Sequence, residues 1–264
     1  MTTTNPTTSE TVTARAAARF ISDYACRLLE CGATCVRIEK NVNRIARTWH
    51  LTAAMTITPA HISLTVSDTG GSDTFTLITA VSHTSVSYDM NTSLSRLSWH
   101  IADNATDPAR ATAMLHEITN RPRPDKWKTL PLVALANASF CRLFGGDATA
   151  MATVFAATTA GYALKLILSE AGMDLRPTLI LCAFVSSVLG ATDGLFSLGS
   201  TPDIAIATSI LYLVPGIPFL NAFSDMIAGH YTCSFSRLAG AAILTCCLSA
   251  GLCGGMLLMG AGMF

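Results

Sequence analysis

The chain has 264 residues and a formal net charge of zero, with a mean hydropathy of +0.45. A chain without a basic excess offers no electrostatic case for nucleic-acid binding. These averages conceal two unlike parts, because residues 1–128 hold 13 of the 17 Lys and Arg residues and 11 of the 17 Asp and Glu residues. Long apolar runs dominate after Lys128, so the composition predicts a soluble domain followed by a membrane domain.

The amino-terminal residues 1–13 are polar and rich in threonine. They lack the apolar core that a secretory signal peptide needs, and their composition predicts a disordered tail. The first run of membrane length starts only near Lys128. We therefore expect everything before this run to remain in the cytoplasm.

A small α+β domain is predicted over residues 14–120. Apolar side chains recur at helical spacing from 14 to 31, and Gly32 can supply the left-handed stop. A second helical pattern runs from about 34 to 49. Its opposite face is basic, which is typical of a solvated helix; contact with anionic lipid headgroups is the functional alternative.

The hydrophobic period then changes to two, which predicts strands. Apolar and polar residues alternate from Ile62 to Val66, a turn signal follows at 68–73, and a second β-like run extends from Phe75 to Val81. Residues 97–101 fit either a further short strand or the edge of a helix. Pro108 marks the start of a helix that ends near residue 120.

The soluble part shows no strong motif for metal binding or catalysis. Cys31 and Cys35 have a spacing that metal ligands use, but no second Cys or His pair with such spacing follows, so no metal is expected. A cytoplasmic location also argues against disulfides. The histidines are scattered, with no carboxylate pair, Ser–His–Asp set or glycine-rich phosphate loop beside them. We therefore predict no cofactor and no enzymatic activity.

Residues 121–128 form a basic linker broken by prolines, and residues 129–264 form the predicted transmembrane domain. The apolar runs predict about five membrane spans. Their approximate bounds are 129–144, 149–168, 178–196, 204–228 and 238–264. Many transporters consist of paired repeats of opposite topology, so an odd number of spans suggests that a second chain supplies the other half.

Two further patterns concern how these spans are placed. The Lys and Arg residues put the linker on the cytoplasmic side, and only Arg142 departs from the orientation that this implies. Small residues in Ala157-x-x-x-Gly161 and Gly251-x-x-x-Gly255 predict close packing between helices, within the chain or against a partner.

The fourth predicted span contains the most informative stretch of the chain. Pro215 and Pro218 interrupt its helix about halfway across a ~30 Å hydrocarbon core. Many secondary transporters build substrate sites from interrupted helices, and a simple proline kink is the alternative. The amino terminus of the half-helix after the break favours an anion. We therefore predict that Pro215, Gly216, Pro218 and Asn221 bind the carboxylate of a substrate.

Asp225 follows Pro215 by about ten residues, roughly 15 Å further along a helix, which places it near the cytoplasmic interface. An ionisable group at this place is a candidate gate or proton carrier, and we assign His230 and Arg237 to the same function. The alternative is an ion pair of Asp225 with Arg237 or His230 that only stabilises a helix end.

The segment from residue 200 to 237 resembles the threonine/serine exporter family. Its matching residues are Ser200-Thr-Pro-Asp203, Leu213-Val-Pro-Gly-Ile-Pro218, Asn221, Asp225, Gly229-His230 and Arg237. Three further stretches resemble motifs of the same family: Cys31–Glu39 with Arg44–Ala46, Leu143–Gly146 and Thr158–Tyr162. The resemblance covers roughly residues 15–264.

Because the chain ends after one membrane half, it resembles the large subunit of the split form of this family. That form pairs with a small integral-membrane subunit, and its members are associated with succinate export, whereas fused members export threonine and serine. The resemblance implies an ion-gradient-driven exporter of small carboxylates or amino acids in the cytoplasmic membrane. A channel-like facilitator and a non-transporting scaffold with a cytoplasmic interaction domain are the alternatives.

Overall fold

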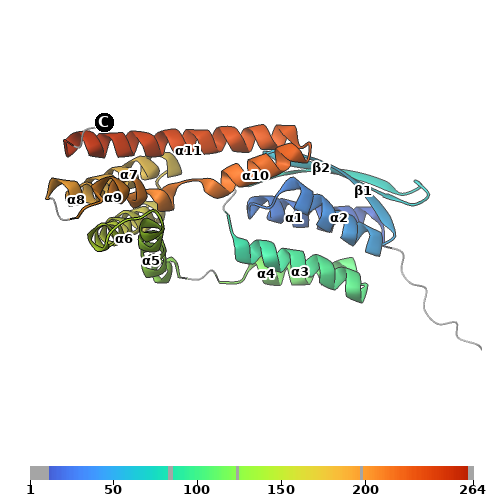
Figure 1. The fold of residues 1–264 in the computed structure, drawn as a ribbon. Coiled ribbons are helices and arrows are strands. Elements are labelled where there is room, and N and C mark those ends of the chain that lie inside the picture. The colour runs from blue at the N-terminus through green and yellow to red at the C-terminus, as the bar shows by residue number, and fades with distance from the viewer. Residues whose placement is uncertain (1–11, 83–85, 123–124, 197–198, 261–264) are drawn as a thin grey trace, which may run out of the picture. The chain divides into compact units, whose positions relative to one another are not determined.

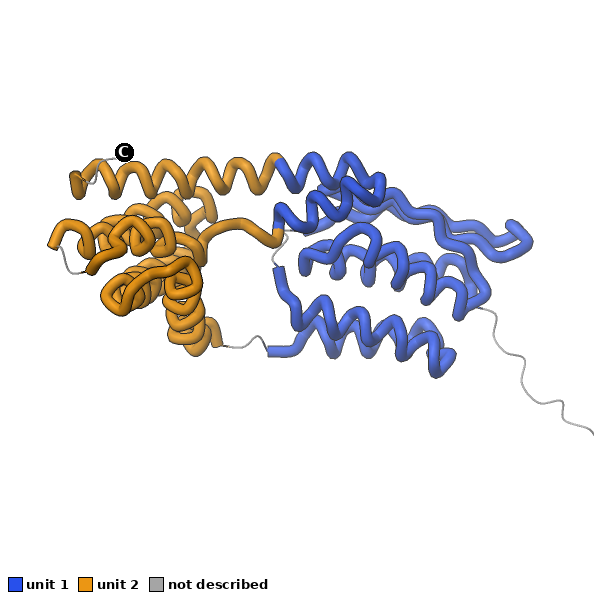
Figure 2. The backbone as a smooth tube through the Cα atoms, viewed as in Figure 1, with its two compact units in different colours: residues 1–122, 218–238 blue, residues 123–217, 239–264 orange. Residues whose placement is uncertain are grey.

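The computed structural model describes residues 12–82, 86–122, 125–196 and 199–260 (Figure 1). The predicted tail at 1–13 therefore lies almost wholly outside the described residues. The chain divides into two compact units (Figure 2). Unit 1 comprises residues 1–122 and 218–238, and unit 2 comprises residues 123–217 and 239–264. The segment 218–238, which the hydropathy pattern assigned to the membrane part, thus packs with the amino-terminal residues.

Unit 1 contains the predicted α+β fold. Its helices are α1 (Ala14–Glu30), α2 (Cys35–Thr48), α3 (Tyr88–Asn104) and α4 (Pro108–Thr119). Its strands are β1 (Leu51–Ile57), β2 (His61–Asp68) and β3 (Thr74–Ala80). The three predicted helices and the strands on both sides of the 68–73 turn are confirmed. Residues 97–101 lie inside α3, so the strand interpretation of that stretch is wrong.

The strands form an antiparallel sheet in the order β1-β2-β3. Leu64 of the central strand pairs with Met55 on one side and Leu77 on the other. Ile62, Leu64 and Val66 are fully buried, as the alternating pattern requires when one face of a sheet covers a core. Each such side chain contributes about 1.5–3 kcal/mol when it leaves water.

Helix α1 lies at the centre of unit 1, where it contacts the sheet and the other three amino-terminal helices. Figure 1 shows the sheet on one side of the α1–α2 layer and α3 with α4 on the other. Tyr24 is completely buried and donates a hydrogen bond to the carbonyl of Leu94 at 2.9 Å. The apolar stripe that predicted α1 therefore faces a core on two sides.

Part of the basic face of α2 packs against α3. Arg44 stacks over the ring of Trp99 on α3 at 3.6 Å and donates to Ser98 at 2.6 Å. Arg37 donates to Asn91 of α3 at 3.0 Å. These two side chains thus hold α3 against α2, while Arg47 remains exposed.

The described residues of unit 2 form helices joined by turns, with no strand among them. Its elements are α5 (Lys126–Leu143), α6 (Ala148–Glu170), α7 (Leu175–Gly190), α8 (Thr192–Leu195), α9 (Pro202–Ser209) and the 3-10 turn η1 (Leu211–Leu213). Helices α10 (Gly216–Ile227) and α11 (Tyr231–Leu258) begin and end in different units. Gly251 and Gly255 of α11 pack so closely on α7 that an added Cβ would overlap the Ile180 carbonyl or the Ser187 hydroxyl. The predicted close helix packing is confirmed here.

Within the described residues, three helices are long and apolar enough to cross a membrane: Ala148–Glu170, Leu175–Leu195 and Tyr231–Leu258. A bent pair, Pro202–Leu213 with Gly216–Ile227, would make a fourth span. The prediction of about five spans is therefore too high. The helix at the first predicted span is α5, which has 18 residues. Its three basic side chains, Lys126, Lys128 and Arg142, separate it from the three more apolar helices.

Candidate functional site

The predicted break in the fourth span is present. The axes of the helical segments before and after residues 214–215 differ by 64°. Val214 is extended, and α10 begins at Gly216, directly after Pro215. The backbone compensates locally, because the Leu211 carbonyl accepts from the Val214 N–H at 3.2 Å and the Val214 carbonyl accepts from the Gly216 N–H at 2.9 Å. The carbonyls that the prolines would otherwise leave without a donor are thereby satisfied.

A buried polar cluster of unit 2 lies beside the helix that leads into this break. Asn137 of α5 donates to the Thr158 hydroxyl at 2.6 Å and to the Thr208 carbonyl at 3.0 Å. Thr208 belongs to the last turn of α9, so the amide of Asn137 satisfies a helix-end carbonyl. Close by in the fold, the hydroxyls of Ser186 and Tyr212 are 3.0 Å apart.

Sequence reasoning did not single out Asn137, Ser186 or Tyr212. Each is a polar side chain inside an apolar run of the sequence, and this pattern could have identified them. In the structure, Asn137 and Ser186 are buried, at 3% and 0% exposed. Buried polar groups in membrane helices face the protein interior and mark candidate sites for polar substrates. The cluster therefore joins the break as a candidate part of the site.

Asp225 of α10 lies in unit 1, where its side chain is completely buried. One carboxylate oxygen accepts from the backbone N–H of Cys35 at 2.8 Å, and the other lies 2.9 Å from Nη1 of Arg237. Cys35 is the first residue of α2, and within the described residues its N-cap, Thr34, makes no side-chain capping bond. The carboxylate of Asp225 thus caps α2 from a distant part of the chain, and the positive end of the helix dipole favours its charge.

Two more predicted residues bind the same turn. Asn221 donates from its amide to the Gly32 carbonyl at 2.8 Å, and Arg237 donates to the Ala33 carbonyl at 2.7 Å. Gly32 has a positive φ of 83°, which ends α1 and turns these two carbonyls toward α10 and α11. We call residues 32–35 the α1–α2 turn. It lies in the first of the three further stretches that resemble the exporter family, 31–39, and contacts the segment 200–237 that carries most of the resemblance.

The structure therefore divides the predicted site residues. Asn221, Asp225 and Arg237 come together on the α1–α2 turn, whereas Pro215 and Gly216 lie at the break, in unit 2. Pro218 stands at the boundary of the two units. His230 is placed apart, with Nε2 3.5 Å from a carboxylate oxygen of Glu39 at a partly exposed position.

The opposite face of α10 is apolar and exposed. Leu220, Phe223 and Ile227, at helical spacing, are 70%, 52% and 89% exposed. The helix is therefore amphipathic, with one face bound to the α1–α2 turn and the other available to lipid or to another protein.

Cysteines surround the buried carboxylate. The Cys35 and Cys233 sulfurs and one Asp225 oxygen lie within 4.8 Å of one another, a set that could hold a metal ion. A hydrogen bond with Cys233 and burial both raise the pKa of the Cys35 thiol. Cys31, which sequence spacing paired with Cys35, instead donates to the Leu28 carbonyl at 3.2 Å, and burial raises its pKa to about 11.

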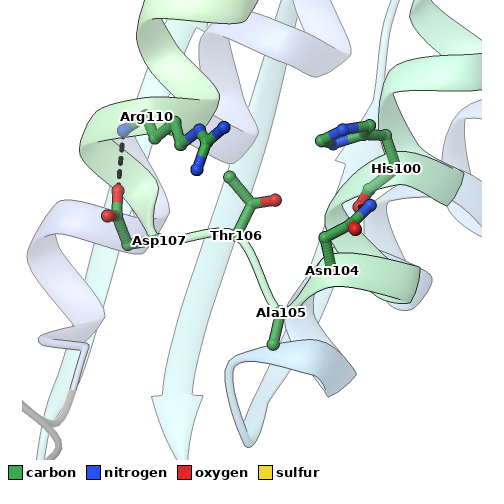
Figure 3. Close-up of a pocket in the computed structure, with 6 residues that line it drawn as sticks. All are labelled: His100, Asn104, Ala105, Thr106, Asp107 and Arg110. Atoms are coloured by element: carbon green, nitrogen blue, oxygen red, sulfur yellow. Dashed lines mark hydrogen bonds between the residues drawn. The ribbon is translucent and has the colours of Figure 1, made fainter.

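A separate hollow of about 240 Å³ opens at the turn between α3 and α4 (Figure 3). His100, Asn104 and Arg110 contribute to its wall. The carboxylate of Asp107 is already used there as the N-cap of α4, because it accepts the Arg110 N–H at 2.7 Å. Asp107 therefore has a structural role in the wall of this hollow.

The apolar helices and the interrupted helix pair indicate an integral membrane protein that also carries an α+β unit. A family model described as a putative threonine/serine exporter matches residues 19–259, and the chain belongs to this family. The family membership that the sequence motifs indicated is thereby confirmed. No solved structure matches the chain.

Three curated relatives are similar to parts of the chain. Two are described as a probable succinate transporter subunit YjjP: that of Escherichia coli K12 is 39% identical over 127 residues, and that of Klebsiella aerogenes is 38% identical over 125 residues. Each alignment covers 47% of this chain and 48% of the relative. A probable threonine/serine exporter of Mycobacterium tuberculosis is 25% identical over 242 residues, which are 89% of this chain and 45% of the relative. The chain thus spans about half the length of the curated relatives it matches.

Proposed function

We propose that this chain is one subunit of an ion-gradient-driven exporter of small carboxylates or amino acids, working with a small integral-membrane partner. The observation that carries the proposal is the interrupted helix at residues 202–227 in a chain of the exporter family. Interrupted helices present backbone groups and helix ends to a substrate within a membrane. The proposal is one of transport and not of catalysis.

The proposal of a partner rests on how two relatives are described. The Escherichia coli relative is itself described as a transporter subunit. Succinate, threonine and serine are the substrates to test first, since relatives are named for them.

Within the proposed site, the backbone after the break and the side chain of Asn221 receive the substrate carboxylate. Pro215 and Pro218 hold the break open, and Gly216 starts the half-helix whose amino terminus favours an anion. In the conformation described, the amide of Asn221 donates to Gly32. Substrate binding by Asn221 therefore requires this hydrogen bond to be exchanged, which couples substrate arrival to the α1–α2 turn.

Asp225 and Arg237 form the proposed gate, with His230 at its edge. The ion pair joins α10 and α11 to the α1–α2 turn, and removing one charge leaves the other buried without its partner. Protonation of Asp225 would weaken the pair with Arg237. This is the physical basis on which proton movement would release α10 and α11 from the α1–α2 turn.

The membrane placement belongs to the same proposal. We place the protein in the cytoplasmic membrane, with residues 14–120 in the cytoplasm and α10 near that surface. The support is the basic linker at 121–128, which positive-inside distribution puts on the cytoplasmic side. The exposed apolar face of α10 then lies against lipid or the partner subunit.

Reconstitution in liposomes tests the proposal. The chain is inserted with the small subunit from the same source, and efflux of radiolabelled succinate, threonine and serine is measured with and without an imposed proton gradient. We expect efflux that needs both subunits and collapses when a protonophore is added. Gradient-independent flux would indicate a channel-like facilitator, and the absence of flux for all three substrates would favour the scaffold.

A further inference from the structure

The strongest site that the transport proposal leaves unused is the buried cysteine cluster of unit 1. Cys35 comes from the first turn of α2, Cys233 from the first turn of α11, and Asp225 from α10. Their ligand atoms lie within 4.8 Å of one another, and the three residues are 0%, 2% and 0% exposed. Three chain segments thus converge on one point inside the unit.

The ligand chemistry suits a thiophilic divalent cation such as zinc. Zinc binds thiolate sulfur at about 2.3 Å and carboxylate oxygen at about 2.0–2.2 Å, so neighbouring ligands of a tetrahedral site are roughly 3.3–3.8 Å apart. The ligand atoms here, all within 4.8 Å, need to move inward by no more than about 1 Å to meet this geometry. Three protein ligands with one solvent molecule is an arrangement that zinc adopts in proteins.

The surroundings of the cluster also fit a metal. Asp225 is oriented by the Cys35 N–H at 2.8 Å and by Arg237 at 2.9 Å, and ligating carboxylates are normally held by such outer contacts. Two thiolates, one carboxylate, one divalent cation and the Arg237 guanidinium sum to zero formal charge. A buried site without net charge avoids the desolvation penalty of an unpaired ion.

The sequence spacing pointed to a different pair. Cys31 and Cys35 are four positions apart, yet the sulfur of Cys31 is engaged with the Leu28 carbonyl at 3.2 Å and is not part of the cluster. The second sulfur ligand is instead Cys233, from a region of the sequence that the hydropathy pattern had assigned to the membrane part. This is why a search for paired spacings could not find the site.

We propose that Cys35, Cys233 and Asp225 bind one zinc-type divalent cation, with solvent as the fourth ligand. Two thiol protons leave as the cation enters, and no electron transfer is involved. The bound ion cross-links α2 to α10 and α11, and so strengthens the same contact that the Asp225–Arg237 pair makes. The inference does not depend on the transport activity.

The test uses the purified full chain in detergent, treated with a reductant and a chelator and then freed of both. Zinc is titrated in competition with a chromophoric chelator, and cobalt is added separately as a spectroscopic probe. We expect one zinc per chain and a near-ultraviolet thiolate-to-cobalt charge-transfer band. Loss of an outer-shell partner lowers metal affinity by about 10–100-fold, so Cys35→Ser or Cys233→Ser should lower it by at least about 100-fold.

Cys31→Ser and Cys26→Ser are the matched controls, because both thiols are buried in unit 1 but lie outside the cluster. Both variants should keep the affinity and the cobalt band. The proposal is overturned if the wild type takes up no zinc, or if Cys31→Ser loses binding while Cys233→Ser retains it.

A measurement on the wild type alone covers the case in which the serine variants do not fold. Alkylation by N-ethylmaleimide in moderate urea is followed by mass spectrometry with and without zinc. Zinc should slow modification of Cys35 and Cys233 relative to Cys26 and Cys31 in the same molecules. Equal rates at all four thiols, or a missing cobalt band, would refute the site.

Discussion

The buried ion pair of Asp225 and Arg237 gives the sharpest quantitative prediction. Asp225→Asn keeps the size of the side chain, and its carbonyl oxygen can still accept the Cys35 N–H. What is lost is the charge that compensates Arg237, whose side chain is only 16% exposed. Breaking one side of a buried pair costs about 3–5 kcal/mol, and partial access of Arg237 to water puts the expected loss near 3 kcal/mol.

The assay is urea unfolding of the purified chain in detergent, followed by the fluorescence of Trp49, which lies in the core of unit 1. A double-mutant cycle with Arg237→Gln measures the interaction energy between Asp225 and Arg237, apart from the contacts that each side chain makes with other residues. The double variant should be more stable than the sum of the two single losses predicts, because no unpaired charge remains buried. Glu117→Gln is the matched control, since its pair with Arg121 at 3.8 Å is exposed and should change stability by less than about 0.5 kcal/mol.

Two outcomes would contradict this reasoning. A loss below about 1 kcal/mol for Asp225→Asn would mean that water or another group replaces the pair at little cost. Strictly additive effects in the cycle would mean that Asp225 and Arg237 do not interact energetically, despite the 2.9 Å separation of their charged atoms.

The remaining predictions concern transport, packing and pH. Asn221→Ala should weaken export and raise the apparent Km in the liposome assay, and an unchanged Km would count against a carboxylate site. Asp225→Asn should insert normally into the membrane yet lose export; undiminished export would remove the proton-carrier idea. Gly255→Val should destabilise the membrane helices by at least about 2 kcal/mol through overpacking, whereas Gly240→Ala, at a position with open space, should be nearly neutral in thermal unfolding. Hydrogen bonds from the first turn of α6 and from Ser200 lower the pKa of Asp147, so its stabilising contribution is complete above the ordinary carboxyl pKa and is lost as the pH falls through the lowered value. Asp147→Asn should therefore flatten the acid side of the stability profile, and an unchanged profile would argue against this linkage.

Local patterns predicted most elements of the α+β part of the fold, although not α3 as a helix. The helical spacing before Gly32, the alternation around Leu64 and the proline at 108 correspond to α1, β2 and α4 with shifts of one or two residues. Each of these signals depends on residues that are near one another in sequence. The break after Val214 was predictable for the same reason, because a prolyl ring acts on its own turn of helix.

The number and the bounds of the membrane spans show where local patterns were insufficient. Residues 129–144 are apolar on average, but the helix that contains them starts at Lys126 and includes three basic side chains. Hydropathy averaged over a window did not reveal where the helix would begin. Helix α11 likewise starts at Tyr231, seven residues before the predicted span.

Periodicity, proline chemistry and motif order are properties of neighbouring residues, and they were therefore enough to predict most of the elements, the break and the family. Three sets of contacts became visible only in the folded chain: Asp225 caps α2, Asn221 and Arg237 bind the α1–α2 turn, and Cys233 lies beside Cys35. These partners are about 190–200 residues apart. A buried charge or thiol takes its partner from whatever element packs against it, and no spacing rule along the chain encodes that choice.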